Sequence, residues 1–396
     1  MTSRPVKGEK FLEFKRCLVH FAVGTEQVFM TTRLDGENTR FFPFNKTYEN
    51  IGVQSESGYR TSYMWEEVLR RDSLLDLLQN FMTVQVNSEK KYNAAKKKFD
   101  EEISEALIFP RYHQRRAVHR LVDDVQKKGA GHTYLVQHSA GSGKSNTITW
   151  LAYRLSNLYQ HAEDDKALFD SVLVVTDRRV LNDQMRANIR QFSTVGGEVY
   201  AIGHGKGAEG HKSTDLKTAI EQKKGRIIIT TVQMFPEIAD TISFFPDRKY
   251  AVIIDEAHSS QSGEKKLNEI IEAEMKRKGH KGNVSFFAFT ATPKPKTIEV
   301  FCERENGSKE PFDIYTMEQA IKEEFILDVM KDYMSFKRYY RLVRDEKFDD
   351  KEYDKKKSVR LLASYVDLQD AAIERKSRIM LEHFASQTVN EIEGKA

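Results

Sequence analysis

The stretch TYLVQHSAGSGKSNT, residues 133–147, runs from a short apolar segment into a glycine-rich turn that ends in Gly143-Lys144-Ser145. Glycines suit a loop whose successive backbone N–H groups wrap phosphate oxygens, a lysine reaches the β and γ phosphates, and a hydroxyl holds Mg²⁺. The stretch therefore predicts a strand, a phosphate-binding loop and a helix whose positive N-terminal end points at the same anion. The predicted ATP ligands in this loop are Ala140, Gly141, Ser142, Gly143, Lys144 and Ser145.

The match to the loop pattern covers only its second half. A full G-x-x-x-x-G-K-[ST] pattern would place a glycine at His138. A glycine turn that merely joins a strand to a helix is therefore the alternative interpretation of GSGKS.

A second motif, AVIIDEAH at 251–258, places two carboxylates directly after an apolar run. Open parallel sheets bind ligands at the carboxyl ends of their strands. There Asp255 would hold Mg²⁺, directly or through water, and Glu256 would accept a proton from the water that attacks the γ-phosphate. Two solvated carboxylates at the start of a helix are the alternative. The apolar run and the position of the pair, 111 residues after Lys144, favour the catalytic interpretation.

Three more apolar runs share this organisation, and each ends in small or polar residues. They are VLVVT at 172–176, RIIIT at 226–230 and FFAFTATP at 286–293. Upstream, Gln114 lies in an arginine-rich helical stretch and could contact an adenine edge through its amide. Five such segments in series predict an α/β fold built on a parallel sheet.

The array resembles the first motor lobe of superfamily 2 helicases and translocases, with an adenine-reading glutamine, a Walker A loop, a Walker B motif of the DEAH form and a TAT motif. Further segments are similar to the restriction (R) subunit of type I restriction-modification enzymes. They are FKRCLVHFAV at 14–23, MTTRL at 30–34, VTDRR at 175–179, TTVQ at 230–233, DEAHSSQ at 255–261, YTMEQAI at 315–321 and FILDV at 325–329. The likeness spans nearly the whole chain.

The resemblance implies an organisation and a set of residue roles. Residues 1–50 would end a PD-(D/E)xK nuclease domain, 51–105 would form a helical linker, 106–305 a RecA-like ATP-binding lobe, and 306–396 a connection toward a second lobe. Lys144, Asp255 and Glu256 would be catalytic, with Ser145 and Asp255 holding Mg²⁺. Residues that couple the ATP site to DNA would be Arg178, Arg179, Thr231, Gln233, His258, Thr290 and Thr292.

We expect the chain to be an internal fragment of such a subunit. Glu13-Phe14-Lys15 spells E-x-K, but no aspartate precedes it to complete a two-carboxylate metal site. No βαβ unit with an arginine finger follows the TAT motif. The fragment is therefore expected to bind ATP and Mg²⁺, to hydrolyse ATP slowly and to cut no DNA.

Composition fits a globular protein that works inside the cell. With 396 residues, 39% hydrophobic and 31% charged, the chain can bury at least one full-size core. No run approaches the roughly 18 apolar residues of a membrane span. Two distant cysteines suit a reducing cytoplasm. A net charge of +4 means that DNA affinity would have to come from local patches.

The function that the resemblance implies is ATP-driven translocation of double-stranded DNA before cleavage, in complex with methyltransferase and specificity subunits. A strand-separating helicase and a nucleotide-gated DNA-binding module are the alternatives. Stimulation of ATP hydrolysis by duplex DNA, by single strands or by neither would distinguish these three functions.

Overall fold

The computed structural model describes the N-terminal two fifths of the chain almost continuously and the rest in segments. The described residues are 9, 12–56, 58–93, 98–161, 163–176, 189, 199–201, 226–231, 247–257, 283–302, 309–328 and a few positions between 373 and 381. They belong to two units, Met1–Leu327 and Asp328–Ala396. In the second unit, Arg378 Nη2 donates to Glu374 Oε1 at 3.0 Å, one helical turn away.

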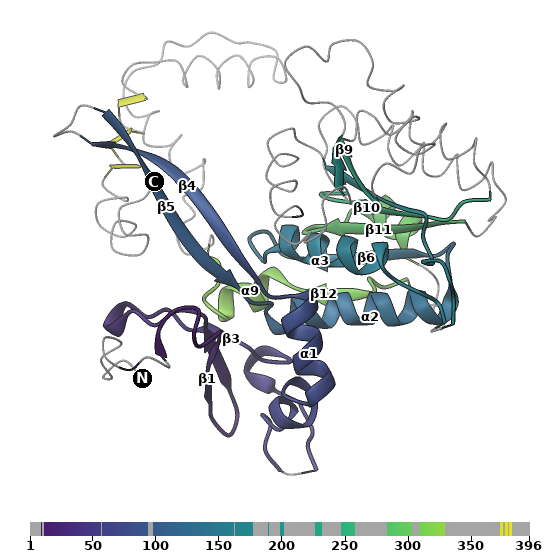
Figure 1. The fold of residues 1–396 in the computed structure, drawn as a ribbon. Coiled ribbons are helices and arrows are strands. Elements are labelled where there is room, and N and C mark those ends of the chain that lie inside the picture. The colour runs from purple at the N-terminus through teal and green to yellow at the C-terminus, as the bar shows by residue number, and fades with distance from the viewer. Residues whose placement is uncertain are drawn as a thin grey trace, which may run out of the picture. The chain divides into compact units, whose positions relative to one another are not determined.

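A seven-stranded sheet dominates the first unit (Figure 1). Its strands lie in the order β12-β6-β11-β10-β7-β9-β8, and every neighbouring pair is parallel. Their bounds are β6 (Thr133–His138), β7 (Ser171–Thr176), β8 (Val199–Ala201), β9 (Ile227–Thr231), β10 (Tyr250–Ile254), β11 (Val284–Thr290) and β12 (Asp313–Tyr315). The predicted α/β class with a RecA-like parallel sheet is therefore confirmed.

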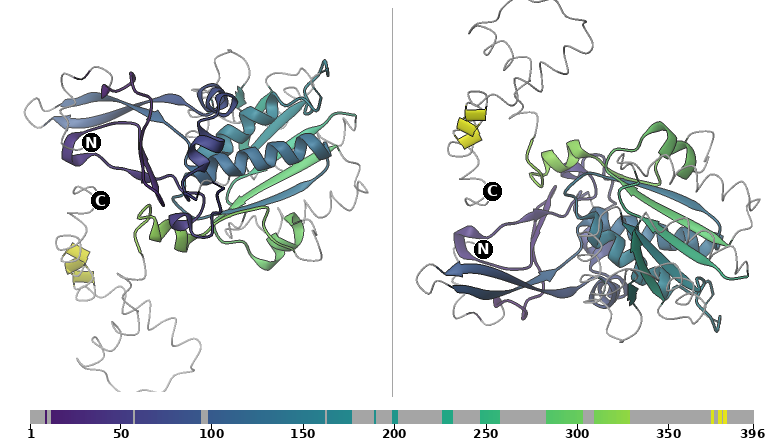
Figure 2. Two further views of the ribbon diagram at one scale, coloured as in Figure 1. Left: turned by 90° about the horizontal axis from the view of Figure 1, so that it is seen from below. Right: turned by 90° about the horizontal axis from the view of Figure 1, so that it is seen from above.

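Helices cover both faces of this sheet (Figure 2). Helices α2 (Tyr112–Lys128) and α3 (Lys144–Ser156) lie on one face and α8 (Pro295–Phe301) lies on the other. Successive side chains of a strand point to opposite faces of the sheet, so each face has a hydrophobic core of its own. In β7, for example, Val172 and Val174 pack in the core of the α2 and α3 face, whereas Leu173 and Val175 pack in the core of the α8 face.

The N-terminal residues form a small antiparallel sheet with short helical segments. Its strands are β1 (His20–Val23), β2 (Val28–Thr31) and β3 (Phe42–Pro43), in that order. Short 3₁₀ helices at Gly36–Asn38 and Tyr48–Asn50, a π-helical turn at Met64–Val68 and helix α1 (Arg71–Asn80) follow. Val28, Phe44 and Tyr63 share a hydrophobic core with Val118 of α2. This region is thus packed directly on helix α2 of the larger sheet.

The predicted helical linker at 51–105 differs from the structure over much of its second half. There β4 (Thr83–Asn93) and β5 (Lys98–Ile108) pair as antiparallel strands. In this ladder Lys90 is in register with Glu101 and Lys91 with Asp100. The predicted end of a nuclease domain at 1–50 and the other domain boundaries stay predictions.

A last helix, α9 (Met317–Lys322), directly follows β12 and is capped by Thr316, whose Oγ1 accepts the Gln319 N–H at 3.1 Å. Within the described part of the chain, no helix is both long and apolar enough to cross a bilayer.

Candidate nucleotide-binding site

The predicted phosphate-binding loop connects β6 to α3. Its two glycines adopt left-handed backbone conformations, with φ of 71° at Gly141 and 82° at Gly143. A Cβ on Gly143 would approach Gln114 Nε2 to 2.5 Å, and one on Gly141 would approach Ile326 Cγ2 to 2.9 Å. Both positions therefore need glycine for conformation and for space. Ala140 at the loop tip is exposed, and Ser145 in the first turn of α3 is half-buried.

Lys144 and Glu256 meet at the open end of this loop. Lys144 is buried, and its Nζ lies 3.3 Å from Glu256 Oε1 and 3.4 Å from the Ser139 carbonyl oxygen. The two side chains come from α3 and from the turn after β10. The structure thus brings together the lysine and the acidic pair that the sequence separates by more than 100 positions.

The turn after β10 is tightly fixed to its neighbours. The Asp255 N–H donates to the Val175 carbonyl at 2.9 Å, and the Ala257 N–H donates to the Phe289 carbonyl at 3.0 Å. Asp255 Oδ1 accepts the Glu256 N–H at 3.0 Å. Glu256 has φ of 51°, a left-handed conformation that costs a non-glycine residue on the order of 1 kcal/mol or more. Such strain persists where the surroundings enforce it, as they do here.

Residues at the start of α2 donate hydrogen bonds to backbone carbonyls of the phosphate-binding loop. The Ser142 carbonyl accepts from Arg111 Nη2 at 2.8 Å and from His113 Nε2 at 3.3 Å. Gln114 Nε2 donates to the Gly143 carbonyl at 3.0 Å and to the Ser142 carbonyl at 3.4 Å, while its Oε1 accepts the Arg111 N–H at 2.9 Å. Gln114 therefore reaches the loop, as a residue of the predicted site should. Its amide is engaged with the loop itself.

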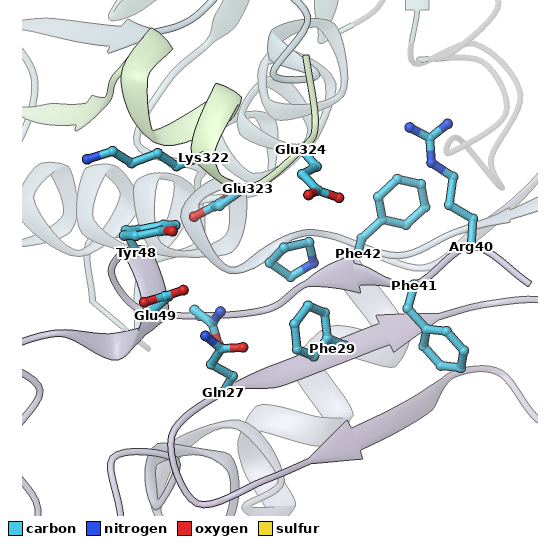
Figure 3. Close-up of a pocket in the computed structure, with 12 residues that line it drawn as sticks. Gln27, Phe29, Arg40, Phe41, Phe42, Tyr48, Glu49, Lys322, Glu323 and Glu324 are labelled. Atoms are coloured by element: carbon cyan, nitrogen blue, oxygen red, sulfur yellow. The ribbon is translucent and has the colours of Figure 1, made fainter. Parts of the chain in front are cut away.

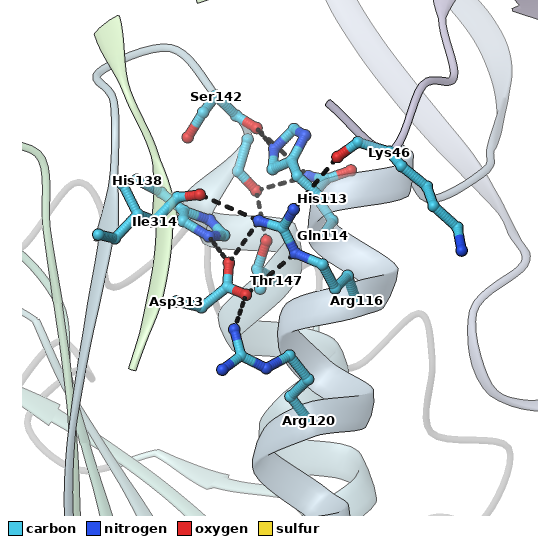
Figure 4. Close-up of polar contacts among 11 residues, drawn as sticks. Lys46, His113, Gln114, Arg116, Arg120, His138, Ser142, Thr147, Asp313 and Ile314 are labelled. Carbon is cyan, nitrogen blue, oxygen red and sulfur yellow. Dashed lines mark hydrogen bonds and ion pairs between the residues drawn. The ribbon is translucent and has the colours of Figure 1, made fainter. Parts of the chain in front are cut away.

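A buried ionic cluster centred on Asp313 lies beside the loop (Figure 4). Asp313 Oδ1 accepts from Arg116 Nη2 at 3.0 Å and from His138 Nε2 at 2.9 Å. Asp313 Oδ2 accepts from Arg116 Nε at 3.1 Å and from Arg120 Nη1 at 2.9 Å. Burial by itself would raise the pKa of Asp313, but His138 and Arg116 outweigh it and lower that pKa to about 2. No pattern in the sequence indicated this cluster.

A family model described as SWI2/SNF2 ATPase matches residues 113–360, which include the loop, the acidic turn and the Asp313 cluster. The chain belongs to the SWI2/SNF2 ATPase family. A curated relative from Methanocaldococcus jannaschii, described provisionally as a type I restriction enzyme MjaVIIIP endonuclease subunit, is 24% identical over 395 residues. The alignment covers 90% of this chain and 36% of the relative, so the chain spans about a third of that relative's length. The resemblance to type I restriction enzymes that the sequence suggested is confirmed.

Two solved structures show weaker likeness to this SWI2/SNF2 ATPase. One is a hypothetical ATP-dependent RNA helicase from Sulfolobus tokodaii, with a TM-score of 0.32 and 18% identity over 47% of each chain. The other is the ATP-dependent type ISP restriction-modification enzyme LlaBIII bound to DNA, with a TM-score of 0.34 and 14% identity over 57% of this chain and 16% of that one. At these scores neither likeness bears on function.

In this SWI2/SNF2 ATPase the short edge strand β12 supports the phosphate-binding loop. The Ser139 N–H donates to the Tyr315 carbonyl at 2.9 Å. The Tyr315 ring stacks on His113, with centroids 3.7 Å apart and planes at 9°. Its hydroxyl donates to Glu323 Oε2 at 2.6 Å, which ties the strand to the end of α9. The segment YTMEQAI, noted in the sequence only for its resemblance, is therefore part of the loop's scaffold.

The remaining predicted site residues fall into two groups. Thr231 and Thr290 end β9 and β11, at the same edge of the parallel sheet as the loop, and Thr292 is exposed in the turn that follows β11. Four lie outside the described residues, namely Arg178, Arg179, Gln233 and His258. Arg116 and Arg120, which belong to the arginine-rich stretch around Gln114, both form ion pairs with the buried Asp313.

Proposed function

We propose that this chain is the ATP-hydrolysing part of a DNA-translocating motor of a type I restriction enzyme. The observation that carries the proposal is the approach of Lys144 to Glu256 at 3.3 Å, at the end of a glycine loop and at the carboxyl edge of a parallel sheet. Membership of the SWI2/SNF2 ATPase family and the type I restriction relative support it.

The donor set fits a triphosphate and Mg²⁺. The loop offers the backbone N–H groups that follow Gly141 and the ammonium of Lys144, which suit phosphate oxygens. Ser145 and Asp255 offer a hydroxyl and a carboxylate, the hard oxygen ligands that Mg²⁺ accepts alongside phosphate and water. Bound there, Mg²⁺ would neutralise charge that develops on the transferred phosphoryl group.

The chain's own residues would divide the work of hydrolysis. Lys144 would bind the β and γ phosphates, and its release from Glu256 would free that carboxylate to accept a proton from the attacking water. Asp255 stays fixed by the backbone, since its own N–H is bonded to β7 and its Oδ1 holds the Glu256 N–H. Ser142 is held by Arg111 and His113, so the loop keeps one shape while phosphate binds.

We further propose that the cargo is double-stranded DNA and that methyltransferase and specificity subunits complete the enzyme. Thr231, Thr290 and Thr292 would face the DNA side, together with Arg178, Arg179, Gln233 and His258. The positions of Thr231 and Thr290 at strand ends, next to the ATP site, support this assignment.

The test is ATP hydrolysis by this chain with duplex DNA, with single-stranded DNA and without DNA. We expect stimulation by duplex DNA and loss of hydrolysis in Lys144→Ala. Lys127→Ala, which removes an exposed lysine of α2, is the matched control and should hydrolyse normally. Stimulation by single strands alone would indicate a strand-separating helicase. Hydrolysis unchanged in Lys144→Ala would overturn the proposed site.

A further inference from the structure

Helix α1 presents an apolar face to solvent, on the side opposite its contacts with the core. Residues three and four positions apart lie on the same side of a helix. One side of α1 therefore carries four exposed residues, Arg71, Leu74, Leu75 and Leu78, which we call the outer face. The three leucines keep 41%, 53% and 43% of their surfaces exposed. A surface helix normally turns polar residues outward, so a leucine-rich outer face is typical of a surface that another protein covers.

The opposite side of α1 is fixed to helices α2 and α3. Leu77 is buried in the core to which both helices contribute. Asp76 Oδ2 accepts from His119 Nε2 of α2 at 2.8 Å, and Asp76 Oδ1 accepts from Arg154 of α3. The outer face is therefore held in place before a partner arrives, which lowers the entropy lost on binding.

The aromatic residues of the N-terminal sheet are engaged in a different way. A pocket of about 400 Å³ lies between this sheet and the end of α9 (Figure 3). In its wall, the Phe42 ring lies 5.9 Å from the Phe325 ring and 5.4 Å from the Arg40 guanidinium. Lys322 Nζ lies over the Tyr48 ring at 5.3 Å. These rings have partners within the fold, whereas the leucines of the outer face are exposed to solvent.

Arg71 gives the outer face a positive charge. It forms no ion pair within the part of the chain that the structure describes, and the same holds for Arg70, the exposed residue directly before α1. The acidic residues of α1, Asp72 and Asp76, lie outside the outer face. Arginine is enriched at protein interfaces, where it pairs well with carboxylates. A partner that covers the leucines should therefore carry an acidic residue opposite Arg71.

Two other occupants suit this face less well. Nucleic acids are bound chiefly through their phosphates, to which leucines donate no hydrogen bond. A second copy of the chain would present the same face, so Arg71 would meet leucines or another arginine and no carboxylate. The ten residues of α1 rise about 15 Å, a length that two to three turns of a second helix can cover.

We propose that the outer face of α1 is a docking site for an amphipathic helix of another protein subunit, in which an acidic residue pairs with Arg71. This inference goes beyond the proposed ATP site and does not depend on it. The leucines pack between side chains of the partner helix, as ridges in grooves. Because Asp76 is bonded to Arg154, the docked subunit is one helix away from α3, which begins at Lys144.

The experiment measures binding of two labelled peptides to the whole chain by fluorescence anisotropy. Both peptides are crosslinked into a helix with leucines on one face. One has a glutamate at the edge of that face, and the other has a lysine at the same position. We expect the glutamate peptide to bind about tenfold more tightly, because attraction to Arg71 replaces repulsion. Arg71→Glu should invert this preference.

Two further variants test the leucines. Leu75→Ser should weaken binding of the glutamate peptide by about tenfold, because a buried leucine is lost from the interface. Ile51→Ser replaces an exposed apolar residue outside α1 and is the matched control. All the substituted residues are exposed, so thermal unfolding of each variant should match that of the natural protein. Hydrolysis of ATP by Arg71→Glu should also be unchanged, which separates this inference from the proposed function.

Several results would overturn the docking site. They are equal affinity for the two peptides, binding of neither, and binding that Leu75→Ser leaves unaltered. A dimer that is seen by analytical ultracentrifugation and dispersed by Leu75→Ser would overturn it in favour of a second copy of the chain. Inversion of the peptide preference by Arg71→Glu would support it, since a purely structural role of Arg71 does not change the sign of that preference.

Discussion

Two ionic clusters lie on either side of the same strand and loop, and they are built in opposite ways. The Asp313 carboxylate is fully buried and accepts four bonds of 2.9 to 3.1 Å from Arg116, Arg120 and His138. Lys144 has longer contacts, at 3.3 Å to Glu256 and 3.4 Å to the Ser139 carbonyl. Glu256 keeps 30% of its side chain exposed, whereas Asp313 exposes none.

The difference separates a cluster whose charges can change partners from one whose charges are fully satisfied by one another. A carboxylate whose oxygens already accept from two arginines and a histidine has nothing to offer a ligand, and its loss leaves the arginine charges uncompensated. Lys144 makes long contacts to Glu256 and to the Ser139 carbonyl. It can therefore exchange Glu256 for a phosphate oxygen with little loss of free energy. We therefore expect substitutions in the two clusters to have separable effects, one on hydrolysis and one on stability.

The largest effect is expected for Lys144→Ala. Removal of the ammonium should lower the rate of ATP hydrolysis by at least about 10²-fold to 10³-fold, as for other groups that stabilise developing charge. The free energy of unfolding should change by less than about 1 kcal/mol, since the contacts of the lysine are long and its ionic partner Glu256 is 30% exposed. Steady-state kinetics and urea denaturation of the same preparation measure both. A large loss of stability in Lys144→Ala would show that Lys144, like Asp313, contributes to the stability of the fold.

Asp313→Asn should show the reverse pattern. Loss of one partner from a buried ion pair costs about 3 to 5 kcal/mol, and here it leaves two arginines near an uncharged amide. Arg120→Ala is the matched control: Arg120 is 51% exposed, so its loss should cost at most about 1 kcal/mol. Urea denaturation of the two variants provides the comparison. Equal losses would mean that Asp313 is not the centre of the cluster.

Stability should fall in mild acid because of the histidines beside the loop. Burial, followed by the charge of Arg111, holds the pKa of His113 well below 6.5, and burial lowers the pKa of His138 although Asp313 opposes it. As pH falls below 6.5, the unfolded chain takes up protons that the native protein does not, so the free energy of unfolding decreases. Each unit by which the native pKa is lowered contributes about 1.4 kcal/mol.

Urea denaturation at pH 7.5 and 5.5 measures this dependence. His113→Phe keeps a ring for stacking on Tyr315 and removes the titrating group, so its stability should depend less on pH than that of the natural protein. His161→Gln removes an exposed histidine and should leave the pH dependence unaltered. The same slope in all three proteins would exclude His113 as a source.

The smallest effect is expected for Tyr315→Phe. The variant keeps the stack on His113 and the backbone bond to Ser139, and it loses the bond from the hydroxyl to Glu323. A single such bond contributes about 1 kcal/mol. Thermal unfolding would detect the loss, and ATP affinity should stay unchanged. A clear drop in affinity would show that α9 acts on the loop through this hydroxyl.

The approach of Lys144 to Glu256 could be predicted from the sequence because the two motifs that carry these residues are local patterns. The glycine loop and the Asp255-Glu256 pair each follow an apolar run, and parallel strands bring their ends to one edge, so Lys144 and Glu256 had to lie near each other. The sheet was predictable for the same reason, since VLVVT and AVII read as buried strands.

The Asp313 cluster and the hairpin were not predictable, for two different reasons. Asp313 binds Arg116 across 197 positions, and neither residue is part of a periodic pattern. In the hairpin, alternating blocks of lysine and acid suit an exposed helix as well as a facing pair of strands. Only pairing with a partner strand decides between these, and sequence composition does not contain that information.

Strand β12 connects helix α9 to the glycine loop, because the Ser139 N–H donates to the Tyr315 carbonyl. β12 is short and parallel to β6. A force that pulls on the chain after α9 would act along β12, parallel to β6. The hydrogen bonds between the two strands would then share the load and break together, not one after another. Tension in the residues that follow Leu327 would reach the glycine loop after passing only α9 and these few bonds. The glycine loop would therefore be among the first parts of the large sheet to change shape under such a force.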